Sequence, residues 1–143
     1  MVISIGRHER ERYKRELCKP FRKLEQKELE EVLYYIDDAI SRIAQSDQLK
    51  LEYKVVGSQK TGVSRRGKWD LDLHIDMPKT KDYYPGRYLA YKLKEYHPDL
   101  FDIYHVDCGS PGEMSHYLVI ATIQKGEYSG LRIDFLDDYW LLH

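Results

Sequence analysis

Apolar residues recur at helical spacing in two parts of the chain and predict amphipathic helices there. In the longer stretch they lie on one face, at Leu24, Leu29, Val32, Leu33, Ile36, Ala39, Ile40 and Ile43. A polar helix from about Gly6 to Cys18, ended by Pro20, is predicted ahead of it. The other helix is predicted to begin near Pro85, because proline is tolerated in a first turn, and to end before His97.

Stretches with a period of two predict strands in the remainder of the chain. Lys50–Val56 alternates in this way, and WDLDLHIDM (69–77) does so strictly, with its polar side chains on one face. A further strand is expected over Phe101–Val106. HYLVIATIQ (116–124) and LRIDFLDDY (131–139) predict a hairpin, because KGEYSG with its two glycines joins them. The chain is therefore assigned to the α+β class, a mixed sheet with helices packed mainly on one face and preceded by two N-terminal helices.

Length and composition indicate one compact domain. The 143 residues are 42% hydrophobic and 33% charged, an ordinary globular balance. We expect a single domain over 1–143, in which the N-terminal helices occupy 1–46 and add a layer or an oligomer contact. No apolar run approaches the roughly 20 residues of a membrane helix, and the N-terminus lacks a secretory signal pattern. A cytoplasmic protein without membrane contact is expected.

Cysteines and net charge say little about function. Cys18 and Cys108 lie far apart without a CxxC partner, so neither a zinc site nor a disulfide framework is predicted. The formal net charge of −1 gives no global attraction for nucleic acid. Basic residues crowd the N-terminal segment, interleaved with glutamates, and two interpretations are open for them: a solvated helix face and a phosphate-contacting surface.

Candidate chemistry begins with Asp70 and Asp72, which share the polar face of the WDLDLHIDM strand. Aspartate is unfavourable in strands, and two carboxylates roughly 4 Å apart cost about 4 kcal/mol at an effective dielectric near 20. A bound cation would compensate them, and Asp134 is the candidate third carboxylate, ahead of Asp137 and Asp138, which lack apolar neighbours on both sides. Three carboxylates suit Mg²⁺, and two ions roughly 3.5 to 4 Å apart suit phosphoryl and nucleotidyl transfer.

The loop between the first two strands is suited to hold a triphosphate. Gly57 lets the backbone approach a ligand, a turn at a strand end presents amides to an anion, and Ser58 adds a hydroxyl. The same loop carries four basic residues, Lys60, Arg65, Arg66 and Lys68. Only one or two of them are expected to point inward, and Lys60 and Arg66 are the candidates for phosphate binding.

These residues resemble the signature of the polymerase-beta-like nucleotidyltransferases. That signature is a Gly-Ser pair, a spacer of 11 residues, Asp-hydrophobic-Asp, and a distant hydrophobic-Asp-hydrophobic; here the parts are Gly57-Ser58, Asp70-Leu71-Asp72 and Ile133-Asp134-Phe135. Gly62 completes a GSxxxG pattern. The pattern is most similar to the catalytic palm of archaeal CCA-adding enzymes, poly(A) polymerases and oligoadenylate synthetases.

The resemblance implies a catalytic palm over 50–138 and a two-metal reaction. Asp70, Asp72 and Asp134 would bind two Mg²⁺ ions, with Mn²⁺ as a substitute, and Asp134 would also assist deprotonation of the acceptor. Gly57 and Ser58 would hold the triphosphate. The implied enzyme transfers a nucleoside monophosphate from a nucleoside triphosphate, such as ATP, to a hydroxyl, and it releases pyrophosphate.

Substrate choice is left open by departures from the pattern. Val63 replaces a frequent Thr or Ser, and Trp69 replaces a frequent Ser or Gly. The acceptor is open between RNA and a small molecule, and a homo-oligomer or a partner subunit is expected to supply its recognition. One alternative is a non-catalytic nucleotide-binding regulatory module within a complex, although all three aspartates are present. Another is a metal-independent interaction domain.

Overall fold

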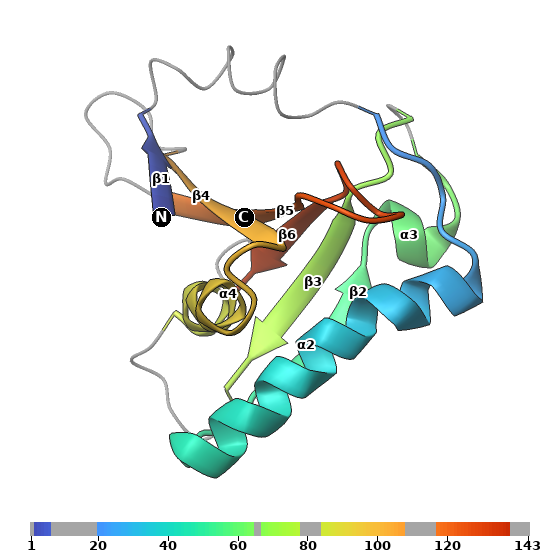
Figure 1. Cartoon of the computed structure of the whole chain (residues 1–143). Coiled ribbons are helices and arrows are strands. Elements are labelled where there is room, and N and C mark those ends of the chain that lie inside the picture. The colour runs from blue at the N-terminus through green and yellow to red at the C-terminus, as the bar shows by residue number, and fades with distance from the viewer. Residues whose placement is uncertain (1, 7–19, 65–66, 78–83, 108–116, 138–143) are drawn as a thin grey trace.

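The computed structural model describes residues 2–6, 20–64, 67–77, 84–107 and 117–137. Along the chain these residues form β1 (Val2–Ile5), α2 (Gln26–Ser46), β2 (Glu52–Val56), α3 (Ser58–Thr61), β3 (Leu71–Asp76), α4 (Pro85–Tyr96), β4 (Phe101–Asp107), β5 (Tyr117–Ile123) and β6 (Arg132–Leu136). The strands form one mixed sheet in the order β1-β4-β5-β6-β3-β2 (Figure 1). β1 pairs in parallel with β4, and β3 pairs in parallel with β6, whereas the other neighbours are antiparallel.

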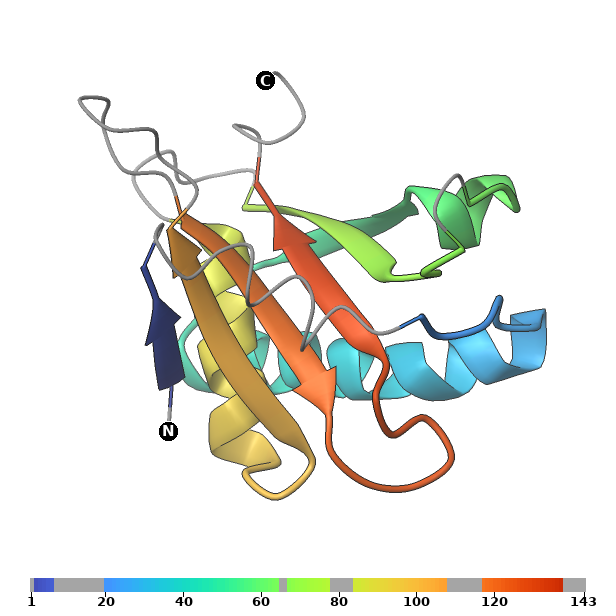
Figure 2. The same ribbon diagram turned by 90° about the horizontal axis from the view of Figure 1, so that it is seen from above.

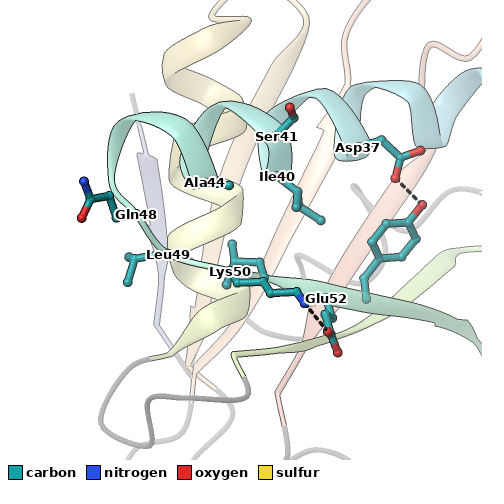
Figure 3. A pocket seen from close by; sticks show the side chains of 10 residues that line it. Asp37, Ile40, Ser41, Ala44, Gln48, Leu49, Lys50 and Glu52 are labelled. Carbon is teal, nitrogen blue, oxygen red and sulfur yellow. Dashed lines mark hydrogen bonds and ion pairs between the residues drawn. The ribbon is translucent and has the colours of Figure 1, made fainter.

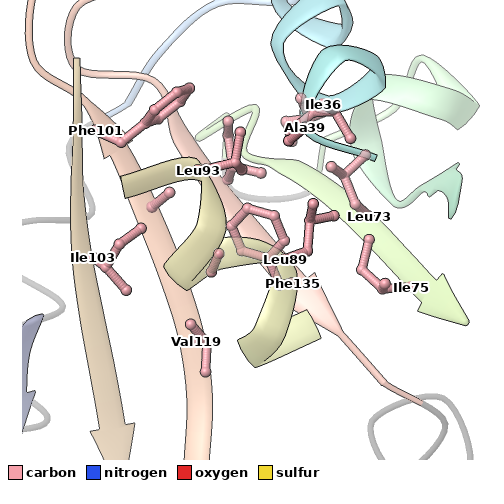
Figure 4. Close-up of a cluster of buried hydrophobic side chains, with 14 of the residues drawn as sticks. Ile36, Ala39, Leu73, Ile75, Leu89, Leu93, Phe101, Ile103, Val119 and Phe135 are labelled. Atoms are coloured by element: carbon pink, nitrogen blue, oxygen red, sulfur yellow. The ribbon is translucent and has the colours of Figure 1, made fainter. Parts of the chain in front are cut away.

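One face of the sheet is covered by both long helices. Alternation along the strands sends apolar side chains toward α2 and α4, where they form the main core. Figure 4 shows Ile36 of α2 and Leu89 and Leu93 of α4 gathered over Leu73 and Phe135 of the sheet. In Figure 2 the strands lie in front of α2 and α4, which confirms the predicted α+β arrangement with helices on one face.

The opposite face carries a small apolar cluster and most of the candidate chemistry. Ile5, Tyr104, Val106 and Ile120 form that cluster on β1, β4 and β5, with Leu118 packed against it. The polar side chains of β3 and β6 continue the same face, because strand alternation places them away from the helices. The candidate site therefore lies on the face that α2 and α4 leave open.

The segment that leads into α2 is fastened to the loop before β3. The Glu25 N–H donates to the Glu28 carboxylate (3.0 Å), which orders the first turn of the helix. Gln59 is buried; its side-chain oxygen accepts from the Leu24 N–H (2.9 Å), and its amide donates to the Trp69 carbonyl (2.8 Å). One buried amide thus joins α2, α3 and the residues just ahead of β3.

The predicted strands β2 to β6 and the predicted helices α2 and α4 are confirmed within a few residues. One element differs: Val2–Ile5, assigned with the N-terminal helices, forms β1. Its pairing partner is β4, about a hundred positions later in the chain. Because that contact is so distant, no pattern among neighbouring residues predicts the strand. The predicted polar helix up to Cys18, and Cys108, lie outside the described residues. The single-domain assignment stays a prediction.

Among the residues that the structure describes, no helix combines the length and the apolar character needed to cross a bilayer.

Truncating the core under α4 should destabilise the fold. Leu93 is fully buried, so Leu93→Ala should lower the free energy of unfolding by about 2–5 kcal/mol, measured by urea denaturation. Tyr34→Ala is the control, because Tyr34 is 65% exposed and should change stability by less than about 0.5 kcal/mol. Equal losses in the two variants would contradict this account of the core.

Candidate active site

The three candidate aspartates lie together on the open face of the sheet. The parallel register of β3 against β6 sets Asp72 directly opposite Asp134. Asp70 lies two residues before Asp72, immediately ahead of β3, and so shares its face. Asp134 is buried, with 8% of its surface exposed. Their proximity follows from the structure, while their catalytic role stays a prediction.

Crowding and burial disturb the ionisation of this cluster. Burial raises the pKa of the Asp72 carboxyl to about 7, and the negative charges of Asp134 and Asp70 add to the rise. Burial, and after it the charge of Asp134, also raises the pKa of Asp70. Negative charge is therefore held here at an energetic cost that a cation would relieve.

Two positive side chains offset part of that charge. Arg132, also on β6, donates from Nε to Oδ1 of Asp134 (2.6 Å) and from Nη2 to Oδ2 (3.0 Å). The same Nε lies 3.9 Å from Oδ2 of Asp70. Lys68 in the preceding loop is the other cation, and it lowers the pKa of Asp70. Three carboxylates thus face two cations, which leaves an excess of negative charge when all are ionised.

Gly57 presses its backbone against the Asp72 carboxylate. A Cβ atom added at Gly57 would lie 2.2 Å from Oδ2 of Asp72, and its φ of +72° also favours glycine. Ser58 begins α3, and its Oγ lies 3.5 Å from the Asp70 carbonyl oxygen. The predicted Gly-Ser pair is therefore adjacent to the predicted carboxylates, at a distance that only glycine permits.

The basic loop residues divide into three groups. Lys60 is exposed on α3 and lines, with Lys23, a groove of about 560 Å³ at the start of α2. Lys68 acts on Asp70, as described above. Arg66, the other predicted phosphate ligand, lies outside the described residues together with Arg65. The phosphate-binding role of Lys60 and Arg66 stays a prediction.

The residues present fit a divalent cation in chemistry. They offer oxygen donors, which Mg²⁺ and Mn²⁺ prefer, and their raised pKa values show that extra positive charge would stabilise them. In their present positions, however, no group of three or more His, Cys, Asp or Glu side chains among the described residues is arranged to hold a metal ion.

A larger groove lies elsewhere and carries no comparable chemistry. It has a volume of about 800 Å³ and is lined by α2, β2 and the segment between them (Figure 3). The Tyr53 hydroxyl donates to Asp37 across it (2.7 Å), and Lys50 pairs with Glu52 (3.7 Å). Tyr53 packs on the helix side of the sheet, opposite the aspartates. Although this groove is larger, it lies away from the three aspartates, and we do not assign the candidate site to it.

Two residues of the site were missed by sequence reasoning. Arg132 has a signal in the sequence, because a residue two positions before Asp134 on a strand must share its face. Gln59 has none, since a glutamine in a polar loop is expected to be exposed rather than buried at three backbone contacts.

No protein-family model matches the sequence, and no curated protein matches it either. Two solved structures are similar in fold. The RNA terminal uridylyl transferase Cid1 has 17% identity and a TM-score of 0.49, over 83% of this chain and 32% of Cid1. The polymerase core of TRAMP, an RNA surveillance complex, has 17% identity and a TM-score of 0.46, over 78% of this chain and 32% of the solved one.

Both solved structures are polymerase-beta-like nucleotidyltransferases, the family whose motifs this chain resembles. The chain spans only 32% of the length of each. At this identity the likeness concerns the arrangement of helices and strands alone. The function proposed below therefore rests on the residues of this chain.

Replacing Gly57 should be more harmful than replacing a glycine with the same backbone preference in open space. Gly57→Ala forces Cβ into the Asp72 carboxylate, whereas Gly126, with φ +87°, has no atom within 4 Å of an added Cβ. Gly126→Ala should cost about 1–2 kcal/mol from backbone strain alone, and Gly57→Ala should cost more. Urea denaturation of both variants measures the difference, and equal losses would rule out the close contact.

The metal-free protein should lose stability as the pH rises. The folded-state pKa of Asp72, about 7, lies above the unfolded value of about 3.9, so the folded state binds the proton more tightly. The stabilising effect of this proton is complete below about pH 4 and is lost by about pH 7. Melting temperatures from about pH 5 to about pH 8 in a chelator should fall less steeply for Asp72→Asn than for the native chain. If the melting temperatures of the two proteins fell in parallel with pH, the raised pKa of Asp72 would be refuted.

Proposed function

We propose that this chain is a metal-dependent nucleotidyltransferase, which transfers a nucleoside monophosphate from a nucleoside triphosphate to a hydroxyl acceptor and releases pyrophosphate. One observation carries the proposal. The β3–β6 register brings Asp134 beside Asp72, on the face that also holds Asp70 and the Gly57 turn. Carboxylates with raised pKa values beside a close-approach glycine suit a centre that handles metal ions and phosphate.

Asp70, Asp72 and Asp134 are the proposed metal ligands. Bound there, Mg²⁺ or Mn²⁺ would supply Lewis-acid stabilisation of the attacking and leaving oxygens. Asp134 is also proposed to assist deprotonation of the acceptor hydroxyl. The register of β3 against β6 supports this role, because it places the Asp134 carboxylate beside Asp72 on the open face of the sheet.

The Gly57-Ser58 turn is the proposed cradle for the triphosphate. Its position beside Asp72 and Asp70 places a hydroxyl and a closely approaching backbone next to the proposed metal ligands. Lys60 and Arg66 are proposed to neutralise phosphate charge. Neither of the long helices α2 and α4 covers the carboxylate face. We therefore propose that a second copy or a partner subunit helps to recognise the acceptor, which is an RNA end or a small molecule. The proposed location is the cytoplasm.

The second candidate is a non-catalytic module that binds a nucleotide within a complex. It shares the cradle and the carboxylates and differs only in the absence of turnover. The enzyme is favoured because all three aspartates of the signature are present, and Asp72 and Asp134 lie opposite each other on neighbouring strands.

Loss of a central carboxylate should abolish turnover. With each labelled nucleoside triphosphate, Mg²⁺ or Mn²⁺ and an RNA oligonucleotide or small hydroxyl acceptors, the native chain should incorporate label and release pyrophosphate. Asp72→Asn and Asp134→Asn should each lower the rate by about a hundredfold or more, since the stabilisation they provide acts in the transition state.

Asp76→Asn is the matched control. Asp76 lies on the same strand and face as Asp72 but about 13 Å further along, so its replacement should leave the rate near the native value. Equal incorporation by the native chain and Asp72→Asn would eliminate the enzyme. Metal-dependent nucleotide binding without incorporation under any of these conditions would favour the regulatory module.

A further inference from the structure

Arg132 places a positive charge against the carboxylate of Asp134. Its side chain is only 12% exposed, and the guanidinium contacts both carboxylate oxygens, at 2.6 and 3.0 Å. This fork-to-carboxylate pairing is the strongest geometry available to an arginine. The approach of Nε to Asp70 (3.9 Å) places the same positive charge between two of the three carboxylates.

The sheet fixes the backbone of Arg132 next to the carboxylates. Arg132 lies on β6 between β3 and β5, opposite Thr122 of β5 and two residues before Asp134. An arginine cannot lose its proton in a protein, so its charge stays in the cluster at any working pH. Each oxygen of Asp134 keeps a second lone pair, but a divalent cation that approaches it meets the positive charge of the arginine.

The pairing directs positive charge at the group that a metal ion would need. Both oxygens of Asp134 face the guanidinium. An arginine and a divalent cation satisfy the same carboxylate oxygens, so the two compete for them.

We propose that Arg132 is an internal counter-ion of the carboxylate cluster, which stabilises the metal-free protein and weakens the binding of a divalent cation at Asp134. This inference rests on the proposed function. It makes Arg132 a positioning residue, since it acts through Asp134. It also implies that the native chain binds metal more weakly than its three carboxylates alone would.

The test is a titration of the full chain with Mn²⁺ alone, by calorimetry, together with melting temperatures in a chelator. Arg132→Gln removes the competing charge, so its dissociation constant for Mn²⁺ should fall by about tenfold, the worth of one charge-assisted pair. The metal-free melting temperature should fall at the same time, because the carboxylates then repel one another without relief. The rise in melting temperature on adding Mn²⁺ should be larger than in the native chain.

Two further variants make the result specific. Arg132→Lys keeps the charge but cannot engage both oxygens, so it should tighten Mn²⁺ binding in the same direction by a smaller factor; it also serves if Arg132→Gln fails to fold. Arg42→Gln is the control, because Arg42 pairs with Asp38 on α2 (3.1 Å), on the helix side of the molecule. It should leave Mn²⁺ affinity unchanged.

The outcomes separate this inference from the function on which it rests. Equal or weaker Mn²⁺ binding by both Arg132 variants, with clear binding by the native chain, would overturn the counter-ion role and leave the proposed function standing. Binding by Arg132→Gln alone would support the counter-ion role and contradict a metal-dependent native enzyme. Binding by none of the chains would overturn both.

Discussion

The candidate site depends on the parallel pairing of β3 with β6. This register sets Asp72 opposite Asp134, while Leu71 and Leu73 on the same strand point into the core under the helices. A slip of one residue would send the carboxylates into that core and the leucines to the open face. The apolar packing that holds the register therefore also holds the chemistry, and the two cannot vary independently.

Holding three carboxylates together opposes folding, and the structure offsets this in two ways. The helix-covered face supplies apolar burial, with fully buried side chains from α2, α4 and the central strands. On the other face, Arg132 and Lys68 supply positive charge beside the aspartates. The unfavourable electrostatics therefore lie on the open face of the sheet, and most of the apolar burial lies on the covered one.

Contacts of Gln59 and Gly57 join the start of the loop before β3 to its neighbours. Gln59 ties α3 to the Leu24 amide and to the Trp69 carbonyl, and Gly57 meets Asp72 within a distance that excludes any side chain. The segment leading into α2 is thus connected through one buried amide to the residues that precede Asp70. The candidate phosphate-binding turn is therefore connected, through Gln59, to the segment that precedes α2.

Helical spacing from Leu24 to Ile43, alternation around Asp70 and Asp72, and the glycine-joined hairpin that carries Asp134 were all readable from the sequence, because each depends on neighbours within a few residues. Only the tertiary structure decided the pairing of β1 with β4, the burial of Gln59, the approach of Arg132 to Asp70 and the raised pKa of Asp72. These features arise between segments far apart in the chain. Periodicity determines which face a side chain takes, whereas register and burial determine what it meets there.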